Sequence, residues 1–384
     1  MRSVLNWTLV ACAAMGLAGC GGGGGGGGST PPPTGGGGGG GAPTDPLGAV
    51  GTLEEEQDRL FESLGLGVIS PGYTRMAASA ESLKTTAAGY CADPANGNLT
   101  TFQDAWRAAM IDWQSITIVR FGPVEENNRR LRIQFFPDPN DAVVNNVTSL
   151  LNDGQPIDEA RVAGSAVGTQ GLPAVEYLLF ELGGLDGSTA GLRRCELLVA
   201  ITENYDTIAD ELALAWDGAG QLLADFTSAS GTFMDRAEVL TFILESLAQE
   251  TEFVADEKVT RPQQTGAMTT ESFRSEHSVE NLIANTAAIR AFLDRGTADT
   301  DYGFRDYLSR AHDGDAISLQ LSNQLQQAET TLAGYTATLE AVLMGTETED
   351  VDSVRTGLQD LADSFIDAAV AADVNLGFNN QDGD

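Results

Sequence analysis

Few residues of this chain could do metal or acid–base chemistry, because only two histidines occur among its 384 residues, His277 and His312. Neither has a second His or a Glu at the spacing of a known zinc motif, and H-E-x-x-H is absent from the sequence. Glu280 follows His277 by three positions, so the two side chains could share one helix face. A site that joins this pair to Glu176 is therefore one hypothesis. The sequence also lacks G-x-S-x-G and a phosphate-binding glycine loop.

Glu176 stands in the segment GLPAVEYLLF at 171–180, which predicts a glycine-led turn that enters an apolar helix. Pro173 is expected at the first helical position, because its fixed φ is already helical and its missing N–H would have no partner there. Glu176 is then expected in the first turn, where exposed amides favour an anionic side chain. Two interpretations of Glu176 stay open: it faces a metal or other ligand, or it only complements the helix dipole.

Four arginines are further candidates, because basic residues are scarce in a chain with 21 Lys and Arg against 55 Asp and Glu. Guanidinium groups bind carboxylates and similar anions through two parallel hydrogen bonds, so two or more arginines converging on one cleft would form an anion clamp. The alternative is that they form salt bridges with some of the many acids. The candidates are Arg120, Arg129, Arg132 and Arg274.

Helices must position these residues, because strand signals are nearly absent and apolar residues recur at spacings of three and four. Such stripes bury against neighbouring helices and predict an all-α, two-lobed helical bundle. One stripe is expected to run unbroken from Leu321 through Leu332 and Tyr335 to Val342. The other stripes run from Phe102 to Ile116, Leu198 to Ala215, Leu240 to Val254 and Val351 to Ala368.

The expected organisation has four parts. Residues 1–19 form a lipoprotein signal peptide, and residues 20–47 form a tether of glycine runs with Pro, Ser and Thr that cannot bury a core. Residues 48–185 form an N-terminal helical lobe that carries Glu176, and residues 186–384 form a C-terminal bundle lobe. The double glycine at 183 and 184 is the candidate boundary between the lobes.

The N-terminus predicts export and lipid attachment. Arg2 precedes an apolar segment from Val4 to Leu17 that is too short to span a bilayer. It ends in Leu17-Ala18-Gly19-Cys20, which resembles the bacterial lipobox, so Cys20 is the expected site of acylation; an ordinary secretory signal is the alternative. Gly21 rather than Asp follows the cysteine, which indicates sorting to the outer membrane, facing the periplasm.

The net charge limits the partners that the protein can bind, and the cysteines indicate the cellular compartment. The net charge is −34, so nucleic acid is excluded as an expected partner because phosphate binding needs clustered cations. An anionic surface attracts cations in general, or serves solubility. Cys12 is lost with the signal peptide and Cys20 carries lipid, which leaves Cys91 and Cys195 as an expected disulfide in an oxidising compartment.

Residues 171–180 resemble the signature of the imelysin-like family, G-x-H-x-x-E followed by an aromatic and aliphatic run. Gly171 and Glu176 match, whereas Pro173 stands at the His position and has no lone pair for a metal. Further imelysin-like stretches are WRAAMIDW at 106–113 with RFGP at 120–123, NNRRLRIQFFPD at 127–138, ESFRSEHS at 271–278 and LGFNNQDGD at 376–384. The resemblance implies a two-lobed, all-helical, periplasm-facing protein, often linked to iron uptake, with the signature at the junction of the lobes. The family is nominally classed as metallopeptidases.

The sequence is interpreted as an imelysin-like envelope lipoprotein that binds a ligand or metal in iron acquisition without robust catalysis. A divalent metal or iron is the candidate cofactor. The expected partners are the membrane, through the lipid anchor, and an iron-uptake or other envelope protein. Two alternatives remain: a metallopeptidase whose metal ligands lie elsewhere, and a structural or partner-binding lipoprotein.

Overall fold

The computed structural model describes residues 45–296 and 301–376. These residues form helices with no strand among them, which confirms the all-α class. The longer helices are α1 (Leu53–Leu64), α2 (Ser70–Ala92), α3 (Leu99–Gln114), α5 (Ala142–Asn152), α8 (Thr189–Ala215), α9 (Gln221–Ser228), α10 (Arg236–Phe253), α12 (Ser278–Asp294), α13 (Phe304–His312), α14 (Asp315–Ala333) and α16 (Val351–Ala371). The short ones are α4 (Arg129–Ile133), α6 (Glu159–Ala163), α7 (Gly171–Glu176), α11 (Arg261–Thr265) and α15 (Leu339–Leu343).

Seven shorter segments connect these helices. Three are π-helical, η1 (Gly65–Ile69), η5 (Tyr177–Leu182) and η6 (Val254–Thr260), and each directly continues an α-helix. Four are 3₁₀ turns, η2 (Gly122–Asn128), η3 (Pro139–Asp141), η4 (Val167–Thr169) and η7 (Ala267–Thr269). Single π turns inside helices are uncommon and are frequent at functional sites.

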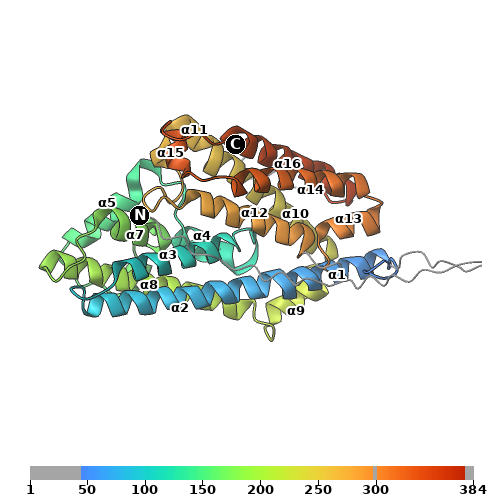
Figure 1. The fold of residues 1–384 in the computed structure, drawn as a ribbon. Helices are drawn as coiled ribbons and strands as arrows, with labels where there is room; N and C mark the ends of the chain where they lie inside the picture. Colours follow the sequence, from blue (N-terminus) through green and yellow to red (C-terminus); the bar gives the residue numbers. More distant parts are fainter. Residues whose placement is uncertain (1–44, 297–300, 377–384) are drawn as a thin grey trace, which may run out of the picture. The chain divides into compact units, whose positions relative to one another are not determined.

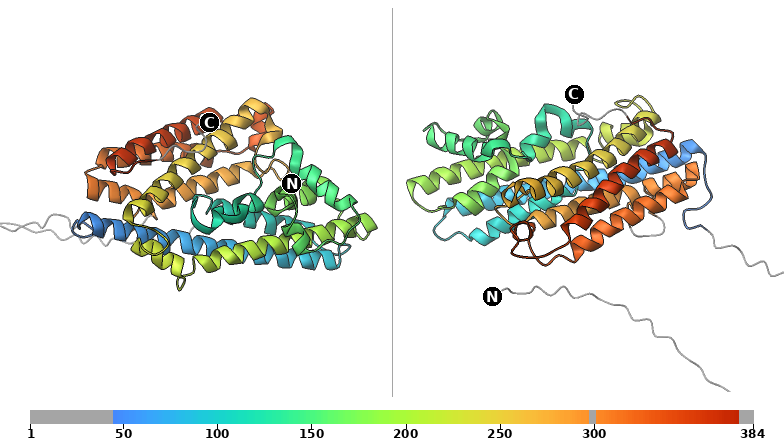
Figure 2. Two further views of the ribbon diagram at one scale, coloured as in Figure 1. Left: turned by 180° about the vertical axis from the view of Figure 1, so that it is seen from behind. Right: turned by 90° about the horizontal axis from the view of Figure 1, so that it is seen from above.

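Two helix pairs make the most extensive contacts in residues 45–376. α8 packs along α2, and α14 packs along α16 (Figures 1 and 2). α12 contacts α3, which packs on α2, and also contacts α14, so it connects the two groups. α10 packs against α16 and η6 and contacts α12. The segment before α12 therefore lies where both groups of helices meet.

The interior holds one large apolar cluster and one small one. The stripe predicted for residues 351–368 is buried at all six of its positions, Val351, Val354, Leu358, Leu361, Phe365 and Ala368. Its first three residues belong to the small cluster between α14, α16 and η6, and the last three belong to the large one. Burial of such stripes, rather than helix propensity alone, stabilises helices of this length.

The stripe expected to run unbroken from Leu321 to Val342 is divided into two helices, so the prediction of one continuous seam is wrong. α14 ends at Ala333, and a new helix, α15, begins at Leu339. The hydroxyl of Thr338 accepts a hydrogen bond from the N–H of Ala341 at 3.2 Å, which is an N-cap that starts the second helix. The apolar spacing continues across the break because Leu332 and Leu339 are both buried in the small cluster.

A disulfide joins Cys91 of α2 to Cys195 of α8, with Cα atoms 5.3 Å apart. The helices on the two sides of residue 185 are therefore covalently connected and share the large apolar cluster. The division into lobes at 185 and 186 stays a prediction about sequence organisation. The signal peptide, Cys20 and most of the tether lie outside the described residues.

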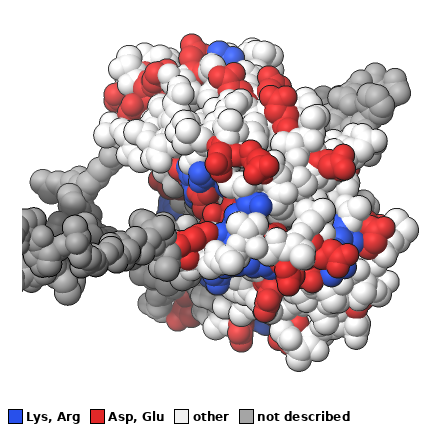
Figure 3. Space-filling model, turned by 90° about the vertical axis from the view of Figure 1, so that its right-hand side faces the viewer, with Lys and Arg blue, Asp and Glu red and all other residues white. Residues whose placement is uncertain are grey.

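Acidic side chains are spread over the surface, and the fewer basic ones lie among them, as Figure 3 shows for one face. Most arginines of residues 45–376 are paired with carboxylates; the bidentate pair of Arg236 with Asp58 is one example. No helix in the described part of the chain is both long and apolar enough to cross a membrane.

Candidate functional site

The signature helix α7 begins where its backbone passes close to the end of α4. Gly171 has φ +69°, and a Cβ atom there would lie 2.1 Å from the carbonyl oxygen of Ile133 and 2.3 Å from that of Arg132. Both the dihedral angle and the close approach require glycine. Gly171 therefore sets the position of α7 against α4.

The helix starts at Gly171, two residues earlier than expected, so Pro173 and Glu176 lie further from its N-terminus than the sequence predicted. Pro173 is the third helical residue rather than the first, a position that tolerates proline because N–H groups of the first turn have no intrahelical acceptor. Glu176 is the last residue of α7, so the prediction that it lies in the first turn is wrong. The carboxylate of Glu176 therefore does not lie at the positive, N-terminal end of the helix dipole. Immediately after Glu176 the helix continues as the π-helical segment η5.

The Glu176 carboxyl group is buried, with 3% of the residue exposed, and is held by one residue from a distant part of the chain. Oε1 of Glu176 accepts a hydrogen bond from the backbone N–H of Ser275 at 2.9 Å and another from its hydroxyl at 2.7 Å. Ser275 is itself buried, in the segment that connects η7 to α12. This contact ties the signature helix to the start of α12.

Burial raises the pKa of Glu176 to about 7. The two hydrogen bonds from Ser275 and the positive charge of Arg274 act in the opposite direction, and the negative charge of Glu271 adds to the rise. Burial is the largest cause because an ionised carboxylate loses its hydration in a low-dielectric environment. Glu176 therefore titrates near neutral pH, and charged groups brought close to it would change its protonation state.

The segment that carries Ser275 has an unusual backbone. Ser272 and Glu276 have φ of 57° and 54°, although neither is a glycine. Left-handed conformations of such residues cost free energy and persist where surrounding contacts determine them. Here Asn281 of α12 donates hydrogen bonds to the hydroxyl of Ser272 at 3.0 Å and to Oε2 of Glu271 at 2.9 Å. These contacts hold the segment in place beneath α7.

A small cavity of about 100 Å³ lies between α7 and this segment. Pro173 and Glu176 line it from α7, residues 134–138 line it from the loop after α4, and residues 268–274 line it from the opposite side. Asp138 in this wall also has a raised pKa, chiefly because of burial, while the N–H of Val143 donates to its carboxylate at 3.2 Å. The cavity is smaller than a typical ligand pocket and would hold one small chemical group.

Arg274 is the one predicted arginine that lines this cavity together with Glu176. Its side chain is 7% exposed, and it donates a hydrogen bond to Glu181 of η5. The guanidinium carbon lies 4.2 Å from the ring centre of Phe273 and 5.4 Å from that of Tyr177. Stacking on two aromatic rings orients the planar guanidinium group at the cavity wall.

The other three predicted arginines do not line the cavity with Glu176, so the anion clamp, one of the two alternatives for these residues, is not formed there. Arg120 pairs with the buried Glu250 at 2.7 Å. Arg129 pairs with Glu211 at 2.9 Å on the surface. Arg132 donates to the side-chain oxygens of Gln170 and Asn204 at 2.9 and 3.0 Å. These contacts join helices and match the salt-bridge or hydrogen-bond alternative.

Glu271, at the edge of the cavity, belongs to a buried polar network. Lys258 of η6 is 2% exposed, and its Nζ lies 2.8 Å from Oε1 of Glu271. Lys258 also donates to the side-chain oxygens of Gln114 and Asn285 at 2.7 and 2.8 Å. Gln134 donates to the same Glu271 carboxylate at 2.8 Å. All three donor positions of the ammonium group are thus used, as a buried charge requires.

Glu250 and Arg120 extend this buried polar region toward α10. Thr117 donates to Oε1 of Glu250 at 2.6 Å, and Asn285 donates to the same threonine hydroxyl at 3.1 Å. Burial by itself would raise the pKa of Glu250, but the positive charges of Arg120 and Lys258 outweigh it and hold the pKa at about 2. Glu250 therefore stays ionised, in contrast to Glu176.

His277 and Glu280 lie beside each other but do not join Glu176 in one site. Nδ1 of His277 is 3.6 Å from Oε2 of Glu280, and neither residue lines the cavity. His277 is the N-cap residue of α12, and its ring lies 6.1 Å from that of Trp106. Burial lowers the pKa of His277, against the opposing influence of the Glu280 carboxylate. Among the described residues, these two side chains and Glu176 are not grouped so that they could hold a metal ion together.

A resident metal does not fit the residues at the signature. A stable catalytic metal site usually needs three protein ligands. Pro173 supplies none, and Oε1 of Glu176 already accepts two hydrogen bonds from Ser275. Within residues 45–296 and 301–376, no three or more His, Cys, Asp or Glu side chains are grouped so that they could hold a metal ion.

Reasoning from the sequence missed Ser275, Glu271 and Lys258. Ser275 and Glu271 stand in the family-like stretch ESFRSEHS, but only Arg274 and His277 were singled out there because of their charge or metal affinity. Lys258 could have been singled out from the sequence, because it is one of only two lysines in the chain.

Comparisons with known proteins agree with this fold. The model of the family described as Imelysin matches residues 69–367, which is more than half of the chain. An imelysin-like protein from Psychrobacter arcticum 273-4 has a similar structure, with a TM-score of 0.70 and 17% sequence identity over 86% of this chain and 99% of that chain. A protein described as an iron-regulated protein A precursor from Parabacteroides distasonis ATCC 8503 gives a TM-score of 0.72, with 16% identity over 86% and 98% of the two chains. No curated protein matches the sequence.

Proposed function

Because the chain belongs to the imelysin family, we propose that it is a ligand-binding protein of the bacterial cell envelope that takes part in iron acquisition and does not hydrolyse peptides. One observation carries this proposal. The signature carboxyl group of Glu176 is buried at a small cavity with a pKa of about 7, while Pro173 occupies the position of the signature histidine. The site keeps an ionisable group for recognition and lacks the metal ligand that peptide hydrolysis would use.

The charges at the cavity indicate the chemistry of the ligand. A group that carries a positive charge or strong hydrogen-bond donors would stabilise the ionised form of Glu176 and release its proton below pH 7. Arg274 on the same wall would bind a neighbouring carboxylate or other anion. The volume of about 100 Å³ admits one such group at a time. We therefore propose that the cavity holds the polar end of a larger ligand.

The proposed link to iron rests on the resemblance to the family and is in line with the name of one structural neighbour, an iron-regulated protein A precursor. At 16% identity this likeness extends to the fold alone, so the role is inferred from the family and not from shared residues. The proposed location rests on Leu17-Ala18-Gly19-Cys20, which would attach the protein to the membrane by lipid and leave the helical part facing the periplasm.

A genetic experiment tests the proposal without knowledge of the ligand. A deletion strain is complemented with the natural gene, with Glu176→Gln, or with Glu280→Gln, a matched change at an exposed carboxylate outside the cavity. We expect the natural gene and Glu280→Gln to restore growth on an iron-chelated medium, and Glu176→Gln to fail. Added iron should remove the difference. Equal growth of all strains under iron limitation would reject the iron role.

A biochemical experiment separates the binding protein from a metallopeptidase. The purified mature protein is incubated with fluorescein-labelled casein, with and without EDTA, and its metal content is measured after dialysis. We expect no chelator-sensitive hydrolysis and less than one zinc per chain. Pro173→His restores an i, i+3 pair with Glu176 and should raise zinc affinity only while Glu176 is present. Chelator-sensitive hydrolysis that disappears in Glu176→Gln would establish the enzyme instead.

A further inference from the structure

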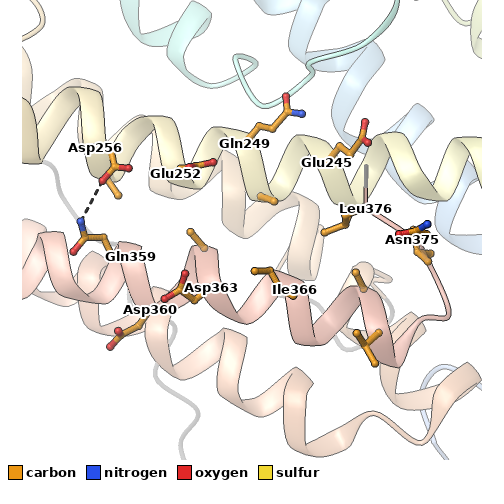
Figure 4. A pocket seen from close by; sticks show the side chains of 16 residues that line it. Glu245, Gln249, Glu252, Asp256, Gln359, Asp360, Asp363, Ile366, Asn375 and Leu376 are labelled. Atoms are coloured by element: carbon orange, nitrogen blue, oxygen red, sulfur yellow. Dashed lines mark hydrogen bonds between the residues drawn. The ribbon is translucent and has the colours of Figure 1, made fainter. Parts of the chain in front are cut away.

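A long groove lies where α10 and η6 pack beside α16, away from the cavity at Glu176. Its volume is about 720 Å³, and residues from both helices and from the segment after α16 line it (Figure 4). Asp256 and Gln359 lie across from each other at one end, where the amide of Gln359 donates to Asp256 at 3.1 Å. Glu245 and Leu376 lie toward the other end. The two walls therefore run antiparallel.

The first wall is polar and follows a regular helical spacing. Glu245, Gln249, Glu252 and Asp256 succeed one another at intervals of four, three and four residues, so they form one stripe along α10 and η6. Three of these four side chains are carboxylates. The stripe spans the 12 residues from Glu245 to Asp256, a length of roughly 16 Å or about three helical turns.

The second wall has the same spacing but is apolar over half its length. Gln359, Asp363, Ile366 and Val370 also succeed one another at intervals of four, three and four along α16. Ile366 is 61% exposed and Val370 is 76% exposed, whereas the residues of α16 that pack on α14 and α10 are buried. Intervals of four and three are the pattern by which helices pack on one another. This face of α16 thus has the character of a packing surface that no helix among residues 45–296 and 301–376 covers.

The groove carries charge of one sign. Its lining includes five carboxylates, Glu245, Glu252, Asp256, Asp360 and Asp363, and no lysine or arginine. Closely spaced carboxylates in a concave surface strengthen one another's negative potential and attract positive groups. The combination of an acidic wall and an apolar wall selects for an occupant that has both a basic and an apolar face.

We propose that this groove binds a basic amphipathic helix of a partner protein. The helix would place apolar side chains at i, i+3, i+4 and i+7 against Ile366 and Val370, and lysine or arginine side chains against the carboxylates of α10 and α16. Three turns would fill the groove and complete a three-helix packing with α10 and α16. This interaction is distinct from ligand binding at Glu176 and does not depend on it.

Charge complementarity argues against two other occupants. The C-terminal segment FNNQDGD that follows Gly377 contains two aspartates and no basic residue, so it does not match the acidic wall. A second copy of this chain carries a net charge of −34 and would be repelled by the groove. Both remain outcomes that the experiment can detect.

The test measures binding of a model helix to the unacylated mature chain, residues 21–384, at physiological salt. The probe is a fluorescein-labelled 18-residue peptide of leucine and lysine with leucine at helical spacing, and the control peptide has the same composition in scrambled order. Fluorescence anisotropy reports affinity. Ile366→Asp adds a negative charge and removes an apolar contact. If the peptide binds only by general charge attraction, its affinity should increase in this variant; if it docks in the groove, its affinity should decrease. Leu214→Asp makes the same change at a position that is 75% exposed on α8.

We expect Ile366→Asp to weaken binding of the helical peptide about tenfold, as is common for a central apolar contact, and Leu214→Asp to leave it within twofold. Asp360→Asn with Asp363→Asn should weaken binding several-fold and reduce its salt dependence. Glu54→Gln with Glu62→Gln on α1 removes the same charge elsewhere and should have little effect. All these side chains are exposed, and unchanged circular dichroism would confirm that each variant is folded.

Three results would overturn the proposal. Equal affinity for the scrambled peptide, or equal affinity of Ile366→Asp and Leu214→Asp, would mean that only general charge attraction is present. Tighter peptide binding after truncation at Leu376 would assign the groove to the C-terminal segment. A dimer in sedimentation that dissociates in Ile366→Asp would assign it to a second copy of the chain.

Discussion

Glu176 and Ser275 lie 99 positions apart in the chain, yet one carboxylate oxygen of Glu176 accepts hydrogen bonds from both the backbone N–H and the hydroxyl of Ser275. The contact joins the signature helix to the start of α12, which in turn packs against α3 and α14. It also buries a carboxyl group without giving it a positive partner at hydrogen-bond distance, because the guanidinium group of Arg274 pairs with Glu181. Its pKa of about 7 is the consequence.

This pKa makes stability depend on pH. Because the pKa of Glu176 is raised from 4.5 to about 7 on folding, the native state binds the proton more tightly than the unfolded state does. The resulting stabilisation is fully present below pH 4.5 and is lost as the pH rises through 7. At about 1.4 kcal/mol per pKa unit, the contribution is roughly 3 kcal/mol. Glu176→Gln cannot ionise, so its stability relative to the natural protein should rise by this order between pH 4 and pH 8.

Urea unfolding at several pH values measures this difference directly. Glu54→Gln, the same change at an exposed position on α1, serves as the control. A difference in stability between Glu176→Gln and the natural protein that does not vary with pH would contradict the raised pKa of Glu176.

The buried pair of Lys258 and Glu271 gives a second prediction. Lys258→Met removes the positive partner of Glu271, which is 4% exposed, and leaves an uncompensated buried charge. We expect a loss of about 3–5 kcal/mol in the free energy of unfolding. The double variant Lys258→Met with Glu271→Gln should recover much of the loss, since it removes both charges. Chemical denaturation of the single and double variants provides the measurement.

Lys84 is the matched control, because it is the only other lysine in the chain. Its side chain is 35% exposed where it pairs with Asp206, whose side chain is 8% exposed, so water screens the pair from the lysine side only. Lys84→Met should therefore destabilise the protein less than Lys258→Met does. If both lysine variants lost the same free energy of unfolding, burial of the lysine would not determine how much each ion pair contributes to stability.

The disulfide between Cys91 and Cys195 gives a third prediction. The two residues are 104 positions apart, and closing a loop of this length stabilises the native state by about 4–5 kcal/mol in the chain-entropy model. The variant with Cys91→Ala and Cys195→Ala should lose a comparable amount on thermal or urea unfolding. Protein prepared from the periplasm should show no free thiol when it is denatured without reductant. Labelling of both cysteines in that experiment would refute the bond.

Membrane attachment is the fourth prediction and concerns residues outside the described part of the chain. Lipid on Cys20 would be the anchor, so Cys20→Ala should leave the protein in the soluble fraction after cell lysis. Residues 45–296 and 301–376 contain no helix that could cross a membrane. Sedimentation of Cys20→Ala with membranes after a high-salt wash would mean that another part of the chain attaches the protein.

The helical class and several helix faces could be predicted from the sequence because they depend on local spacing. The stripe at residues 351–368 is buried at every predicted position. The stripe at 321–342 is buried up to Leu332 and again at Leu339, but Tyr335 and Val342 are only partly buried. It is also not continuous, because the backbone turns after Ala333 and Thr338 caps a new helix. Apolar spacing determines which side of a helix is buried, whereas the helix end depends on hydrogen bonds at single residues.

The sequence by itself also determined the family, the departure of Pro173 from its signature and, by counting cysteines, the pair that forms the disulfide. Only the tertiary structure decided the partners of the charged residues. The sequence did not distinguish among the four arginines that were candidates for the site. In the structure only Arg274 of these four lines the cavity with Glu176, while Arg120 is bound to Glu250. A chain with 55 acids offers every arginine many possible partners. The choice among them depends on how helices from distant parts of the sequence cross, and on which charges that packing removes from water.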